Sequence, residues 1–344
     1  MRTPEFWQAF LSLDLSVSKS RALLSKLGTS CVTAEDLERS PALSSQERQR
    51  LIGRKPLTPG QRELLKVVSC EDDGFPDNLK LMQLPPVALM VSGDLRPEDA
   101  LAVAIVGTRK ASPYGRATAR RIATDLAGAG VTVVSGAAFG IDAEAQKAAI
   151  QAGGRTIAVV GSGLDRPYPA SHRGLLQDVA RNGAVLSQFA LGAAPDWWRF
   201  PERNYVIAGL ARAIIVIEAP NKSGALLTAN LANEEGRMVF VVPSRMDDEG
   251  FVGSFRLIND GATLLYSAGQ IFDSLGIQAA LPARSDYKAT SSQRAILEKL
   301  SSEPRLADTL SEELDQPAGA ILAELTRLEV EGLVAKSAGG YIRL

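Results

Sequence analysis

The sequence has 344 residues, of which 45% are hydrophobic and 22% charged, and its formal net charge is -1. This length accommodates two or three domains of about 150 residues each, and the composition excludes a disordered or collagen-like chain. No apolar run reaches the roughly 18 residues that a membrane-spanning helix needs. The first residues include Glu5 and Asp14 and lack the basic and apolar segments of a secretory signal, so we expect a cytoplasmic protein.

Cysteine and histidine are too scarce for two common kinds of site. The chain has two cysteines, Cys31 and Cys70, and a single histidine, His172. These numbers exclude a disulfide scaffold and a zinc site of familiar spacing. Acid–base catalysis would have to use carboxylates or His172 itself. We therefore expect no metal and no cofactor.

The charges are unevenly distributed along the chain. Residues 100–270 contain 17 Lys and Arg against 14 Asp and Glu, whereas residues 287–344 contain 7 against 9. A nucleic-acid partner needs only a local basic site, because affinity for phosphate depends on where the charges lie. The middle of the chain is the better candidate for such a site.

Residues 1–66 predict a small helical domain of the SAM-like type. Leucines at helical spacing, such as Leu23, Leu24 and Leu27, are followed by the helix breaker Gly28. The turn after Leu27 could contact a phosphate backbone, or the domain could simply pack on its neighbour. A glycine after a helix is mainly a stop signal, which favours packing.

From 67 to 275, short β-branched runs alternate with helical stretches. The runs lie at 66–70, 87–93, 102–107, 131–136, 156–161, 184–189, 213–219 and 238–243. One intervening helix face is supplied by Ala119, Ile122, Ala123 and Leu126. The alternation is typical of a parallel sheet covered on both faces, and it predicts an α/β, extended Rossmann-like domain over 67–275.

Residues 276–290 interrupt this pattern and predict a linker. Residues 291–344 then show three helical stretches and an alternating segment around a Gly-Gly turn, which predicts a winged-helix domain. Its third helix would normally enter the major groove. Here that helix carries Arg327 against Glu324, Glu329 and Glu331. Such a face repels phosphates, so a protein contact is favoured over DNA recognition.

The strand-to-helix turns of the central domain contain residues suited to a phosphate-bearing ligand. In open parallel sheets, ligands lie beyond the carboxyl ends of the strands, where backbone N–H groups and helix N-termini attract anions. The turns combine glycines, hydroxyl groups and the cations Arg109, Lys147 and Arg203. The predicted phosphate-binding set is Gly107, Thr108, Arg109, Ser135, Gly136, Gly140, Lys147, Arg203, Asn204, Ser223, Gly224 and Thr228.

Other features of these turns narrow the choice of ligand class. The turn at 161–174 lacks the third glycine of GxGxxG, and the chain has no Walker A loop. Asp142 is expected to cap the helix that begins beside it. Three aromatic residues, Phe139, Tyr168 and Phe200, lie in the same turns and are available either for stacking on bases or for packing.

Five ordered motifs in the central domain resemble those of a known family. The chain reads IVGTRxxSxYG from 105, SGxAxGIDxxA from 135, TIAVVGxGLDxxYP from 156, FPxRNxxIxGL from 200 and EAxxxSGALLTA from 218. In order and spacing these are similar to the DNA-processing protein A (DprA/Smf) family. The resemblance implies an extended Rossmann-like domain that binds single-stranded DNA, loads the RecA recombinase onto it during natural transformation, and forms homodimers.

The resemblance also assigns roles to particular residues. It implies a basic pocket made by Arg109, Lys147 and Arg203 with Asn204, and it places the dimer contact in the central domain. The chain departs from the family's usual residues at Gln146, Gln188 and Ser244.

Two other functions are left open by the residues. The same sheet edge could hold a nucleoside monophosphate, with Glu218 or Asp142 as the acid–base group of a phosphoribohydrolase-like enzyme. Such enzymes normally carry a PGGxGT loop, where this chain reads NKSGALLTA. An adaptor that binds only protein would leave the basic turns without a purpose. We therefore predict a non-catalytic recombination mediator that binds single-stranded DNA.

Overall fold

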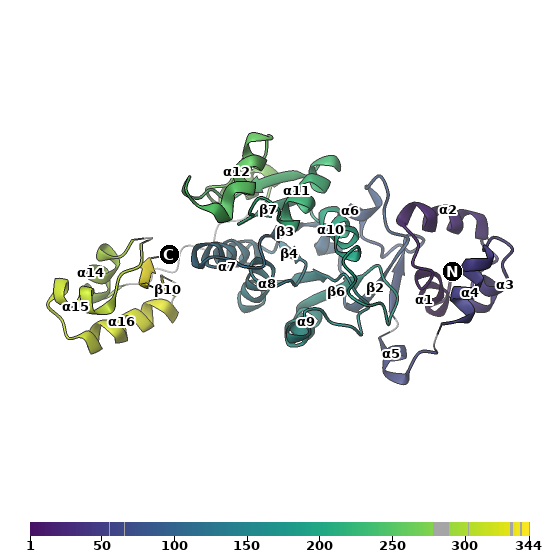
Figure 1. The fold of residues 1–344 in the computed structure, drawn as a ribbon, viewed down its shortest axis with the longest axis horizontal. Coiled ribbons are helices and arrows are strands. Elements are labelled where there is room, and N and C mark those ends of the chain that lie inside the picture. The colour runs from purple at the N-terminus through teal and green to yellow at the C-terminus, as the bar shows by residue number, and fades with distance from the viewer. Residues whose placement is uncertain are drawn as a thin grey trace.

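The computed structural model describes residues 1–54, 56–64, 66–277, 289–301, 303–330, 333–337 and 339–343. Among these residues, short helices come first, a nine-stranded sheet with helices on both faces follows, and three helices with a hairpin end the chain (Figure 1). None of the described helices is both long and apolar enough to cross a membrane.

The N-terminal region is a group of helices held by local capping. The helices are α1 (Pro4–Leu11), α2 (Val17–Leu27), α3 (Ala34–Arg39), α4 (Ser45–Ile52) and α5 (Pro59–Glu63). Thr33, Ser44 and Thr58 each open a capping box, which explains where α3, α4 and α5 begin. The rings of Phe6 and Phe10 are fully buried in the core of this group.

Specific polar contacts join these helices to the sheet region. Gln8 Nε2 donates to the Leu191 carbonyl at 3.3 Å, and Gln8 Oε1 accepts from the Leu191 N–H at 2.9 Å. Asp14 pairs with Arg199 at 2.9 Å, and the Arg199 guanidinium lies 4.6 Å from the Trp198 ring. The helical region is therefore packed on its neighbour, which is one of the two possibilities that the sequence left open.

The central sheet is mostly parallel, as predicted. Its strands are β1 (Val67–Ser69), β2 (Ala88–Gly93), β3 (Ala102–Val106), β4 (Thr132–Ser135), β5 (Thr156–Val159), β6 (Gly183–Ser187), β7 (Ala213–Val216), β8 (Met238–Val241) and β9 (Thr263–Leu264). Their order is β1-β2-β6-β5-β4-β3-β7-β8-β9. The strands from β6 to β9 run parallel, whereas β2 pairs antiparallel with β6 and β1 antiparallel with β2. The α/β prediction is confirmed, and β2 is the one strand of this sheet that runs in the opposite direction.

Helices cover both faces of this sheet. They are α6 (Asp77–Lys80), α7 (Pro113–Gly128), α8 (Ile141–Gln151), α9 (Arg173–Asn182), α10 (Arg199–Leu210), α11 (Gly224–Glu234), α12 (Val252–Asn259) and α13 (Ala268–Leu275), with short 3-10 turns η1 (Pro97–Ala100), η2 (Ala170–His172) and η3 (Glu249–Phe251). Successive side chains of a strand point to opposite faces. In β3, Val103 and Ile105 pack with α7 and α8, whereas Ala104 and Val106 pack with α10 and α11. The helix face predicted on α7 is buried in the first of these layers.

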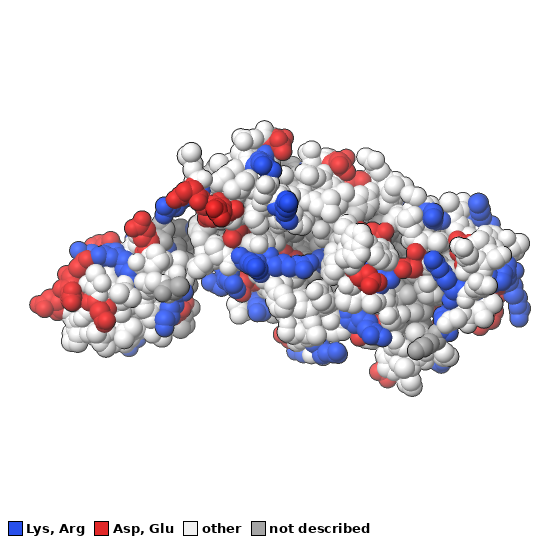
Figure 2. All heavy atoms as spheres, in the orientation of Figure 1, with Lys and Arg blue, Asp and Glu red and all other residues white. Residues whose placement is uncertain are grey.

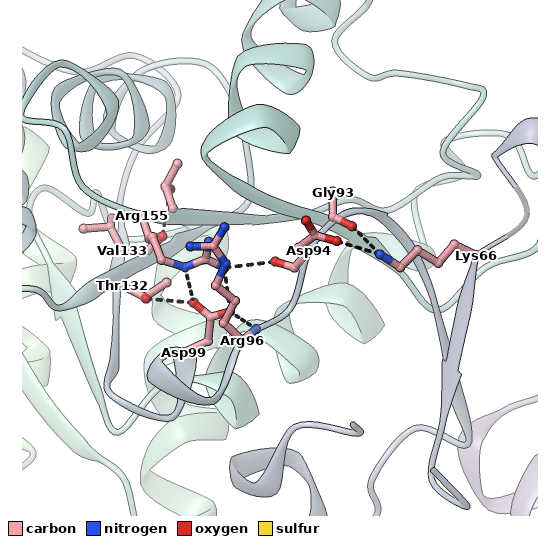
Figure 3. Close-up of polar contacts among 9 residues, drawn as sticks. Lys66, Gly93, Asp94, Arg96, Asp99, Thr132, Val133 and Arg155 are labelled. Atoms are coloured by element: carbon pink, nitrogen blue, oxygen red, sulfur yellow. Dashed lines mark hydrogen bonds and ion pairs between the residues drawn. The ribbon is translucent and has the colours of Figure 1, made fainter. Parts of the chain in front are cut away.

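Polar residues close the edge where the central parallel strands begin (Figure 3). Asp99 accepts from Arg155 Nε at 2.9 Å and Nη2 at 2.8 Å, and from the Thr132 hydroxyl at 2.9 Å. Lys66 pairs with Asp94 at 2.8 Å beside it. The Asp99 carboxylate raises the pKa of Arg155. These charges satisfy one another within the fold.

The C-terminal region contains the three helices and the hairpin predicted from the sequence. Its elements are α14 (Ser291–Lys299), α15 (Ala307–Leu314), α16 (Ala318–Val330), β10 (Val334–Ser337) and β11 (Gly340–Arg343). The two strands pair antiparallel, and Ile296, Leu310, Ile321 and Leu325 are fully buried between the helices. The predicted linker, 276–290, falls mostly outside the described residues.

Charge separates the C-terminal and central regions. On the face shown in Figure 2, acidic side chains gather at the C-terminal end, and basic side chains form a band over the region of α7 and α8. Arg327, the basic residue of α16, pairs with Glu324 at 2.7 Å. Glu331, which the sequence analysis counted on the same helix, lies outside the described residues.

Candidate functional site

A hollow at the carboxyl edge of the sheet brings together the turns that follow β3, β4 and β5. These strands are neighbours in the sheet, and parallel strands end at the same edge. The hollow, called here the β4 pocket, encloses about 310 Å³, part of it open to solvent. It is lined by Arg109, Gly136, Ala138, Phe139, Gly161, Tyr168, Pro169, Phe200 and Arg203.

The turn after β4 is held by Asp142 of α8. Asp142 Oδ2 accepts from the N–H of Gly136 at 3.1 Å and from the N–H of Ala138 at 3.4 Å. Gly140 has a φ of 75°, and a Cβ at this position would collide with the Thr108 carbonyl oxygen, so glycine is required. The expectation that Asp142 caps α8 is wrong, because α8 has no side-chain cap and this carboxylate binds the preceding turn instead.

Arg203 is a buried cation that joins the ends of β4 and β5. Its Nη1 donates to the carbonyls of Gly136 at 2.5 Å and Val159 at 2.6 Å, and its Nε donates to Asn204 Oδ1 at 3.1 Å. Burial lowers the pKa of Arg203 to about 10, although the Asp142 charge opposes this change. Burial likewise raises the pKa of Asp142, against the attraction of Arg203. Arg203 therefore remains a cation at neutral pH and contributes a fixed positive charge to the pocket.

Phe200 and Arg109 form an aromatic and cationic wall of the pocket. The exposed Arg109 guanidinium lies 5.4 Å from the Phe200 ring centroid, and Arg203 lies 5.9 Å from it. The Tyr168 ring is 5.6 Å from the Phe200 ring. A Cβ on Gly161 would lie 3.0 Å from Phe200, so this glycine makes room for the ring. Exposed ring faces beside guanidinium groups suit a ligand with both phosphates and flat bases.

Other predicted residues shape the turns rather than line the pocket. A Cβ on Gly107 would lie 2.5 Å from Ile141, so this glycine lets α8 approach the end of β3. The Thr108 N–H donates to the Glu218 carbonyl at 2.8 Å. The buried Ser135 hydroxyl donates to the Ile105 carbonyl at 2.7 Å.

The remaining predicted residues do not line the pocket. Lys147 is exposed on α8. Asn204 is buried beside Arg203 and donates to the Gly224 carbonyl at 3.4 Å. Ser223 accepts from the Ala225 N–H and caps α11. The buried Thr228 hydroxyl donates back to the Gly224 carbonyl at 3.4 Å. Hydroxyls near helix starts commonly make such local bonds.

Glu218 occupies the point at which the strand connections reverse direction, between β3 and β7. Its Oε2 accepts from the Ser112 N–H at 2.9 Å and from the Ser112 hydroxyl at 2.7 Å. A Cβ on Gly115 would collide with the same carboxylate. Burial raises the pKa of Glu218, against these two hydrogen bonds. The start of α7, where nucleotide phosphates bind in related folds, is therefore already occupied by a carboxyl group of the chain itself.

The sequence analysis missed Ala138, Gly161 and Pro169 as pocket residues. Gly161 and Pro169 lie in the turn after β5, where the sequence analysis considered the dinucleotide fingerprint and the ring of Tyr168 but neither of these two residues. The position of this turn in the alternating pattern could have indicated these residues, because the turns after neighbouring parallel strands converge at one edge of the sheet. Among the described residues, no group of three or more His, Cys, Asp or Glu could hold a metal ion.

Comparison with known proteins assigns the chain to a family. The family model described as DNA recombination-mediator protein A matches residues 66–276, and the DprA winged helix domain matches residues 280–340. Protein Smf of Escherichia coli is 35% identical over 81% of this chain and 77% of its own length. Protein Smf of Synechocystis is 40% identical over 66% of this chain, and the match spans 58% of that relative's length.

Two solved structures agree with the assignment. The X-ray structure of DNA processing protein A from Streptococcus pneumoniae matches 79% of this chain and 98% of its own, with a TM-score of 0.66 and 32% identity. DNA processing protein A from Helicobacter pylori, whose structure was solved for its single-stranded DNA binding mode, matches 61% of this chain and 95% of its own, with a TM-score of 0.55 and 30% identity. The chain therefore belongs to the DNA recombination-mediator protein A (DprA/Smf) family.

Proposed function

We propose that this protein binds single-stranded DNA in the β4 pocket and along the basic surface of α7 and α8, where Lys147 is exposed. We propose further that it delivers the strand to the RecA recombinase. The observation that carries the proposal is the pocket itself, where the exposed cation Arg109 and the fixed cation Arg203 stand beside aromatic rings. Phe139 and Tyr168 are 47% and 42% exposed, so their faces are accessible to bases. A flexible strand can present phosphates and bases to such a surface together, which a duplex cannot.

The family supports the proposal. The matching family model is named for recombination mediators, and the H. pylori relative has a described single-stranded DNA binding mode. By extension, we place this protein in the cytoplasm, acting as a homodimer through its central domain on strands taken up in natural transformation. The phosphoribohydrolase-like alternative is disfavoured by Glu218, because Ser112 and Gly115 enclose its carboxylate against α7.

Strand binding is tested by fluorescence anisotropy of a labelled oligo-dT and a matching duplex at several salt concentrations. We expect a salt-sensitive preference for the single strand. Arg109→Ala should weaken binding and should reduce the slope of log affinity against log salt concentration by about 0.7 per lost phosphate contact. Lys147→Ala should do the same. Arg181→Ala is the matched control, because Arg181 is 71% exposed at the far end of α9 and pairs with Asp178. Equal affinity for both DNAs, or an unchanged slope in both variants, would contradict the proposal.

The mediator step needs a separate measurement. RecA assembly on a single strand covered by single-strand binding protein should start sooner when this protein is present, and Arg109→Ala should abolish the gain. If the protein binds the strand without any effect on RecA assembly, the mediator step is contradicted and the protein acts only as a DNA-binding module. Release of free base from nucleoside monophosphates would instead support the enzyme.

A further inference from the structure

His172, the single histidine of the chain, lies behind the β4 pocket and contacts its wall. Its Nδ1 is 2.9 Å from the Ala137 carbonyl oxygen. Its ring lies edge-on to the Phe139 ring, with 4.7 Å between the centroids and an interplanar angle of 72°. A carbonyl oxygen only accepts hydrogen bonds, so Nδ1 must carry the proton. His172 itself is not one of the residues that line the pocket.

The residue that His172 holds has an unusual backbone. Ala137 has a φ of 50°, in the left-handed region that residues with a side chain rarely adopt. Its methyl group is fully buried in a cluster with Leu175 and Val179 of α9. Asp142 binds the N–H groups on both sides of it, and His172 binds its carbonyl. The turn keeps this conformation because neighbours on every side determine it.

This turn sets the place of Phe139 in the pocket wall. Phe139 follows Ala137 by two residues, lines the pocket and is 47% exposed. The imidazole and phenyl rings meet in a T-shaped contact, and Phe139 also lines the pocket. A half-exposed phenyl ring that lines the same pocket as Arg109 suits a nucleobase.

We propose that His172 is a positioning residue for single-strand binding, which fixes the turn at Ala137 and supports Phe139 as a stacking surface for a base. This inference rests on the proposed function. His172 acts through Phe139 and does not contact a phosphate. Two of its consequences can be measured separately, one without DNA and one with it.

The first measurement is the tautomer of the imidazole in the full-length protein without DNA. Because the chain has one histidine, protein labelled with 15N-histidine gives a single pair of ring nitrogen signals. We expect the neutral ring to carry its proton on Nδ1, although free histidine favours Nε2. A neutral ring protonated on Nε2 would overturn the proposed hydrogen bond, whatever the protein does with DNA.

The second measurement separates the hydrogen bond from the ring contact. In His172→Asn the amide nitrogen keeps the donor to Ala137 and the ring is lost, whereas His172→Leu loses both. We expect Phe139→Ala to weaken oligo-dT binding about tenfold, His172→Leu by a similar factor, and His172→Asn by about threefold. The slope of log affinity against log salt concentration should equal that of the wild type in all three variants. Arg173→Ala is the control, because Arg173 is next to His172 and its loss would reduce this slope if the turn contacted a phosphate directly.

Coupling between the two rings is the decisive observation. In a Phe139→Ala background, His172→Asn should have no further effect on affinity, because His172 acts through Phe139. Additive effects, or a flattened salt slope in His172→Asn, would overturn the inference. Urea unfolding of the Phe139 and His172 variants checks that each of them remains folded. If Arg109→Ala weakens binding and the His172 and Phe139 variants do not, this inference fails and the proposed function stands. If the wild type binds no single strand, both fail.

Discussion

The buried pair of Asp142 and Arg203 predicts a large and specific loss of stability in Asp142→Asn. The asparagine keeps an oxygen that accepts from the N–H groups of Gly136 and Ala138, so the substitution removes little besides the negative charge. Arg203 would then be a buried cation beside the pocket without its counter-charge. Its Nη1 would still donate to two backbone carbonyls, whose dipoles compensate only part of the loss.

The size of the effect follows from the burial of both groups. The lowering of the Arg203 pKa from 12.5 to about 10 is equivalent to about 3 kcal/mol, even with Asp142 in place. Asp142 and Arg203 attract each other as buried charges, and removing the charge that compensates a buried ion costs about 3–5 kcal/mol. We therefore expect Asp142→Asn to lower the free energy of unfolding by about 3–4 kcal/mol.

The assay is urea unfolding, with hydrogen exchange of the β4 and β5 amides as a local probe. Glu144→Gln is the control, because it makes the same charge change on the same helix and breaks a partly exposed pair with Arg120, at a cost of about 1 kcal/mol or less. The double variant Asp142→Asn, Arg203→Met should be less destabilised than the sum of the single variants. A loss below 1 kcal/mol for Asp142→Asn, or strict additivity, would refute the reasoning.

Three further predictions concern other parts of the central domain. Asp99→Ala removes the partner of Arg155 and should cost about 2–3 kcal/mol in urea unfolding while oligo-dT affinity stays unchanged; a change in affinity would contradict its purely structural role. Gly140→Ala should cost well over the roughly 1 kcal/mol of Gly153→Ala, because both glycines have positive φ and only Gly140 would also collide with backbone; equal losses would contradict this. The raised pKa of Glu218 means that the folded state binds its proton more tightly, so wild-type stability should fall as pH rises from the ordinary glutamate pKa through the raised one. Glu218→Gln should lack this fall, and parallel pH profiles of the two proteins would contradict the assignment.

The sequence predicted the strands well because of how a parallel sheet is buried. A strand covered on both faces needs apolar side chains on both, so β3 reads as a continuous apolar run, with Ala104 on one face and Val103 and Ile105 on the other. The order of the strands depends on which edge each connection reaches. The local sequence pattern does not indicate which edge is reached. The antiparallel pairings of β1 with β2 and of β2 with β6 could not be predicted for the same reason.

The site was predicted in part. Arg109, Gly136 and Arg203 line one pocket because the turns after parallel strands converge. The inward direction of Arg203 could not be predicted, because its counter-ion, Asp142, lies on a distant helix and nothing near it in the sequence marks it as buried. Hydroxyls such as Thr228 look like anion ligands in a sequence, yet they bond to their own helix.

The contacts of the N-terminal helices have a mechanical consequence for the pocket. Asp14 forms an ion pair with Arg199, the first residue of α10. The next residue, Phe200, is part of the pocket wall. Any swing of the helical region must break this ion pair and both hydrogen bonds of Gln8. A displacement of the N-terminal helices would therefore shift the start of α10 and, one residue further on, the Phe200 ring beside Arg109.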